Sequence, residues 1–143
     1  MSSSSKSTIL NITSIASIVA SVVAIIYGLC LTAVRSISRS ELNDVLEMQG
    51  VPQDGEFVDT MFLLAELGGY YSLFNVLEVV ALTFVLLGKR IGFHLYVAAQ
   101  IGCIGLLVMV AGVADSISYL LWNAVWCLLY WNLIFRPAEA QKD

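Results

Sequence analysis

One acidic residue, Glu78, stands near the centre of a long apolar segment, where a carboxyl group could do chemistry. It lies 11 residues before Lys89, which corresponds to about 16 Å along a helix. An ionised carboxylate near the middle of a bilayer costs about 2.5–3.5 kcal/mol on insertion scales. We therefore expect Glu78 to be neutral, to pair with a polar neighbour, or to face water.

Three amide side chains are candidates for that neighbour. Gln100 stands as far after the Lys89–Arg90 turn as Glu78 stands before it, so an antiparallel pairing predicts a hydrogen bond between them. Asn75 lies one helical turn before Glu78 on the same face, and Asn132 in the last apolar segment falls near the same depth. The cluster is either a proton or cation site, or a set of interhelical hydrogen bonds worth about 0.6 kcal/mol each.

Other reactive side chains give weaker signals. His94 is the only histidine, and as a haem or pigment ligand it would need a second ligand from another subunit. The three cysteines lie in apolar segments without metal or redox spacing. Three tryptophans in the last segment could bind lipid, a quinone or a neighbouring protein. We expect no metal site and no catalytic residue, and any cofactor would be bound lipid or quinone.

Four apolar segments must position these residues, at 8–34, 67–88, 91–114 and 117–135. Each is near or above the ~20 residues that a helix needs to cross a bilayer. The chain is 59% hydrophobic and 13% charged, with a mean hydropathy of +0.85. The sequence therefore predicts an all-α, multi-pass integral membrane protein, with residues 1–143 forming one bundle of four transmembrane helices.

The connection 35–59 is predicted to carry a short amphipathic helix at about 40–49. Ser38 and Glu41 match a capping box, and Leu42 and Leu46 recur at helical spacing. Apolar residues 57–67 would extend the second membrane helix outward, with a kink at the Gly68–Gly69 pair.

The distribution of charge predicts the orientation in the membrane. Lys89 and Arg90 form a short basic turn, which the positive-inside rule places in the cytoplasm. Both termini are then cytoplasmic, with Lys6, Arg136 and Lys142, and the acidic connection 35–59 faces outward.

Small residues recur on two of the predicted helices. They are Ala16, Ala20, Ala24 and Gly28 on the first, and Ala98, Gly102, Gly105 and Gly112 on the third. Small residues let helices approach closely in a membrane. We expect these two seams to pack against each other or against another subunit.

A resemblance to a known family adds one further candidate. The stretch Leu77-Glu78, followed by an apolar run ending in Leu86-Leu87-Gly88-Lys89-Arg90, resembles the second helix of DoxX-like proteins, which are small four-helix bacterial membrane proteins. That resemblance implies a redox or quinone-linked function.

Our leading interpretation is a non-enzymatic accessory or scaffolding subunit of a larger membrane complex, because no catalytic constellation is present. The first alternative is an oligomeric channel or proton/cation transporter that uses Glu78, and the second is the DoxX-like function.

Expected partners are other membrane subunits or a second copy, together with lipid. The seven basic residues are dispersed, which argues against nucleic-acid binding.

Overall fold

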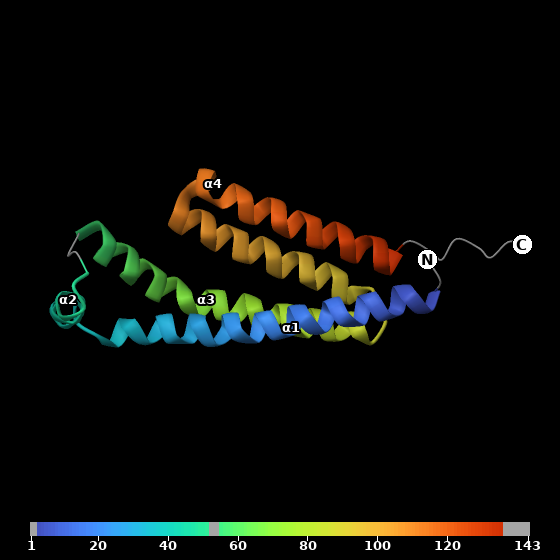
Figure 1. The fold of residues 1–143 in the computed structure, drawn as a ribbon, viewed down its shortest axis with the longest axis horizontal. Helices are drawn as coiled ribbons and strands as arrows, with labels where there is room; N and C mark the ends of the chain where they lie inside the picture. The colour runs from blue at the N-terminus through green and yellow to red at the C-terminus, as the bar shows by residue number, and fades with distance from the viewer. Residues whose placement is uncertain (1–2, 52–54, 136–143) are drawn as a thin grey trace, which may run out of the picture.

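The described chain is built of helices, as Figure 1 shows for a computed structural model that describes residues 3–51 and 55–135. The elements are α1 (Ser3–Ala33), a single 3₁₀ turn (Val34–Ser36), α2 (Arg39–Met48), α3 (Gly55–Leu86) and α4 (Ile91–Phe135). No strand occurs within these ranges. The predicted all-α class is confirmed, and α1, α3 and α4 are each long and apolar enough to cross a membrane. Arg136 and Lys142 lie outside the described residues.

Helix α4 reverses direction at Gly112 and forms two limbs, 91–111 and 113–135 (Figure 1). Gly112 has φ 79° and ψ 172°, a conformation that glycine adopts at little cost. The rings of Tyr96 and Tyr130 lie 5.0 Å apart and those of Phe93 and Phe135 lie 5.4 Å apart. These pairs show that the limbs run antiparallel.

The bend corrects two sequence predictions. The sequence placed the connection between 114 and 117, whereas the chain reverses at Gly112 without a separate loop. Gly112 was also expected to be a packing residue, but a Cβ added there would meet nothing within 4 Å. Its positive φ angle shows that this glycine is needed for backbone conformation and not for helix packing.

Helices α1 and α3 lie side by side and cross closely at two glycines. A Cβ added to Gly68 would lie 2.6 Å from the Gly28 carbonyl oxygen, and one added to Gly28 would lie 2.7 Å from the Gly68 oxygen. Close by, the Ser72 hydroxyl donates to the Ile25 carbonyl oxygen at 3.1 Å. Helix α3 is continuous through Gly68 and Gly69, and Gly68 permits the close crossing.

The two predicted seams do not pack against each other. Gly28 contacts α3, and a Cβ at Gly102 would collide with the Phe74 ring of α3. Gly105 has nothing within 4 Å of an added Cβ, and Ala98 is exposed. Of these seam residues, Gly28 and Gly102 each pack against α3, which contacts both α1 and α4.

Helix α2 and the first turns of α3 form a small cluster at one end of the bundle. Leu42 and Leu46 pack with Val58 of α3, and Arg39 pairs with Asp59 at 2.7 Å. Helix α3 begins at Gly55, as expected from the prediction that residues 57–67 extend the second membrane helix outward, and these contacts hold that extension against α2.

The expected capping box begins α2. The Ser38 side chain accepts from the Glu41 backbone N–H at 3.3 Å, and the Glu41 carboxylate accepts from the Ser38 N–H at 2.8 Å. Two hydrogen bonds to the Glu41 carboxylate, first from the Ser38 backbone N–H and then from the Ser38 hydroxyl, each at 2.8 Å, hold the pKa of Glu41 below its usual value.

The Gly28–Gly68 crossing predicts different effects of alanine at two adjacent positions. Gly68→Ala should lower the free energy of unfolding by about 1–3 kcal/mol, because the new methyl group meets the Gly28 backbone. Gly69→Ala should be neutral or slightly stabilising, because its Cβ would approach only Thr32 Oγ1, at 3.9 Å. Unfolding of both variants in detergent micelles, followed by tryptophan fluorescence, measures the difference. Equal stability of the two variants would contradict this account of the crossing.

Candidate binding site inside the helix bundle

Glu78 lies on α3, eight residues before the end of the helix at Leu86, with only 8% of its surface exposed. Its carboxyl group lies beside Ser21 of α1, whose hydroxyl donates to the Ser17 carbonyl oxygen at 2.9 Å, and beside the Gln100 side chain of α4. The structure therefore brings together three helices around one acidic group. Gln100 is the neighbour that counting from the basic turn indicated.

A cavity of about 400 Å³ lies beside this carboxyl group. Its polar lining residues are Ser17, Ser21, Asn75, Glu78, Gln100 and Asn123. Its aromatic lining residues are Tyr71, Tyr96, Tyr119, Trp122 and Trp126. The remaining lining residues are Ala16, Ala20 and Ala24. The cavity therefore combines one carboxyl group with amides, hydroxyls and aromatic rings, and its lining contains no basic side chain.

The alanines of α1 help to leave this space open. Ala16 and Ala20 line the cavity and are also exposed, as is Trp122 on the second limb of α4, with 60% of its surface exposed. The cavity consequently reaches the surface between α1 and that limb. Towards the end where α1 begins, the Tyr130 hydroxyl and Ser17 Oγ lie 3.1 Å apart and join the two helices.

The prediction that Asn132 belongs to this cluster is wrong. Asn132 is exposed and donates to the Leu128 carbonyl oxygen of its own helix. Asn123 lines the cavity in its place. The bend explains the difference, because Asn123 lies 11 residues after Gly112 and Gln100 lies 12 before it, which places them at similar depth in antiparallel limbs.

His94 lies away from the cavity. It is exposed, and its ring centroid is 5.8 Å from that of Phe93 and 6.1 Å from that of Phe135. Across residues 3–51 and 55–135, no group of three or more His, Cys, Asp or Glu side chains could hold a metal ion.

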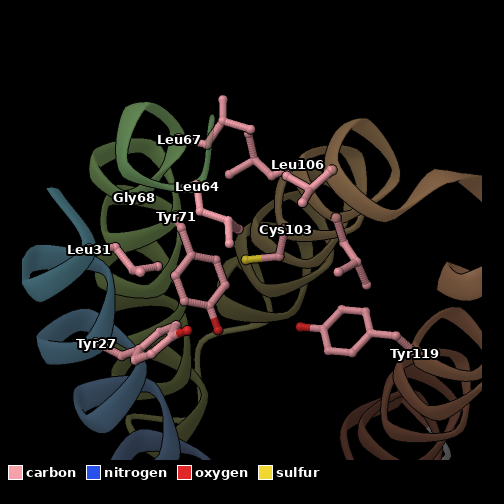
Figure 2. A pocket seen from close by; sticks show the side chains of 11 residues that line it. Tyr27, Leu31, Leu64, Leu67, Gly68, Tyr71, Cys103, Leu106 and Tyr119 are labelled. Carbon is pink, nitrogen blue, oxygen red and sulfur yellow. The ribbon is translucent and has the colours of Figure 1, made fainter. Parts of the chain in front are cut away.

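A second pocket, of about 230 Å³, adjoins the cavity towards the bend at Gly112. Tyr71 and Tyr119 line both spaces. Figure 2 shows the hydroxyl ends of these two tyrosines and the Cys103 thiol directed into the pocket, with leucines of α3 and α4 around it. Sequence reasoning missed this pocket, because its apolar residues look like ordinary packing residues in a membrane helix.

Comparison with protein-family models, with curated proteins and with solved structures found no match. The chemistry of the cavity is therefore inferred from the residues of this chain.

The Tyr130–Ser17 contact predicts energetic coupling between α1 and the second limb of α4. Tyr130→Phe and Ser17→Ala should each destabilise the bundle, and the double variant should lose less than the sum of the two. The expected coupling is about 0.6 kcal/mol, the average for such bonds between membrane helices. A double-mutant cycle on unfolding in micelles measures it, and strict additivity would show that the bond does not form.

Proposed function

We propose that the chain is an integral membrane protein with four membrane-spanning segments, namely α1, α3 and the two limbs of α4. The limbs 91–111 and 113–135 would be about 31 and 34 Å long, enough to cross the hydrocarbon core. Large apolar side chains are exposed along α1 and along the second limb of α4, as expected for surfaces that contact lipid.

The proposed orientation places the Lys89–Arg90 turn in the cytoplasm. The beginning of α1 and the end of α4 lie at the same end of the bundle as this turn, opposite α2 (Figure 1). Helix α2 carries Glu41, Asp44 and Glu47. The positive-inside rule then favours an outward α2 and cytoplasmic termini.

For the function, we propose proton or cation transport that uses Glu78. The observation that supports it is that Glu78 lines a cavity that reaches the surface between α1 and the second limb of α4, instead of being enclosed in a packed helix interface. Ionisable groups inside membrane segments are costly and commonly mark ion or proton pathways. Ser21 and Gln100 would hold the carboxyl group in position while its proton or cation exchanges.

The direct test is flux into liposomes that contain the purified protein. Wild-type protein should carry protons or monovalent cations, measured with a pH-sensitive dye inside the liposomes and a potassium gradient. Glu78→Gln should reduce the flux at least about tenfold, because it keeps the side-chain shape and removes the exchangeable proton and negative charge.

Glu66→Gln is the matched control, because Glu66 lies on the same helix, is exposed and does not line the cavity. Its flux should equal that of the wild type, and circular dichroism should show that both variants fold. Equal flux through wild type and Glu78→Gln, or no flux through the wild type, would contradict the proposal.

A second candidate is an accessory or scaffolding subunit of a larger membrane complex. It is supported by the opening between α1 and the second limb of α4, beside which Leu121, Trp122 and Val125 are exposed. A helix of another subunit could cover this opening. Native mass spectrometry after mild detergent extraction from the source membrane should then detect a heteromeric assembly, whereas a lone chain or homo-oligomer would count against it.

A further inference from the structure

We propose that the ligand of the Glu78 cavity is an amphiphilic organic cation, with an ammonium head beside Glu78 and an apolar tail in the adjoining pocket. This inference rests on the proposed function and specifies its substrate class. It depends on the chemistry of the cavity, the position of the second pocket and the direction in which the cavity opens.

The acidic group of the cavity specifies the head group. The Glu78 carboxyl group lines the cavity and favours a ligand that donates hydrogen bonds and carries a positive charge. Since the lining contains no lysine, arginine or histidine, an anionic head would meet a carboxyl group without any compensating charge. An ammonium group donates to the Glu78 carboxylate and pairs with its charge.

The aromatic lining favours a cation independently of the carboxyl group. Trp122 and Trp126 are one helical turn apart, with ring centroids separated by 5.9 Å, and Tyr96 also lines the cavity. Aromatic faces attract ammonium groups, and the attraction grows as the site is desolvated. A neutral head would gain nothing comparable from these rings.

The adjoining pocket specifies the tail. It begins at Tyr71 and Tyr119, which it shares with the cavity, and continues between Leu64, Leu67 and Leu106 (Figure 2). Along α3, Leu64 and Glu78 are 14 residues apart, or about 21 Å. A polar site and an apolar site in line, joined by two tyrosines, match an amphiphile better than a small inorganic ion.

The opening of the cavity supports the same class of ligand. It lies between α1 and the second limb of α4, where the surrounding surface is apolar. In a four-span protein this surface faces lipid, so a ligand would enter from the bilayer. An amphiphilic cation partitions there, whereas a hydrated inorganic cation does not.

The experiment measures binding to the full chain in zwitterionic nanodiscs by equilibrium dialysis, with binding to empty nanodiscs subtracted. The probes are octylammonium, octanoate and octanol, which share a chain length and differ in the charge of the head. Octylammonium should bind at least about tenfold more tightly than octanoate or octanol. This comparison needs no variant, so it does not depend on a substituted protein folding.

Two substitutions then test which side chains contact the head and the tail of the ligand. Glu78→Gln should weaken octylammonium binding at least about tenfold, and Glu66→Gln should leave it unchanged. Leu106→Trp, which fills the apolar pocket, should weaken octylammonium at least about fivefold more than propylammonium. Equal binding of the three octyl probes, or equal effects of Leu106→Trp on the long and short ammonium ions, would overturn the proposal.

Failure of this inference is distinguishable from failure of the proposed function. If Glu78-dependent proton or cation flux occurs but octylammonium does not bind, the substrate class is wrong and the transport function stands. If octylammonium binds in a Glu78-dependent manner but neither protons, potassium nor octylammonium itself crosses the liposome membrane through the protein, the ligand class is right and transport is wrong.

Discussion

The close crossing of α1 and α3 at Gly28 and Gly68 is the constraint on which the rest of the bundle depends. Each glycine brings a backbone carbonyl within 2.7 Å of the position that the other's Cβ would take, so neither position has room for a side chain. Because α1 follows α3 so closely here, it leaves a space between itself and the second limb of α4. The alanines of α1 then face that space without filling it, and the Glu78 cavity results.

The polar residues around this space are arranged differently from those of a purely structural hydrogen-bond network. In such a network every buried donor and acceptor should have a partner. Gln100 Oε1 has none, although the same side chain interacts with Glu78. Departures from local packing rules are most often found at functional sites. The incomplete network beside Glu78 therefore agrees with the interpretation of the cavity as a functional site.

The sequence predicted the features that depend on counting along a helix from a fixed point. The Lys89–Arg90 turn is such a point, and it correctly indicated that Gln100 lies beside Glu78. Features that depend on which helix faces which could not be predicted. Small residues at regular spacing promote close approach to any partner, so the seam of α1 did not reveal that Gly28 meets Gly68. The sequence favours Asn132 over Asn123 because it places the turn between residues 114 and 117. The chain turns at Gly112 instead, and this shift brings Asn123 to the depth of Gln100. The backbone angle at Gly112 sets the position of the turn, and the residue pattern does not encode that angle.

The presence of a carboxyl group at residue 78, instead of an amide, is itself informative. A glutamine at this position could bond to both Ser21 and Gln100, since an amide both donates and accepts. It would join the helices without the risk of a charge in the membrane, where an ionised acid costs about 2.5–3.5 kcal/mol on insertion scales. Hydrogen bonding between helices alone therefore does not require the acid. What the carboxyl group adds is the capacity to hold a proton or a positive charge, and the aromatic cavity beside it provides the space for one.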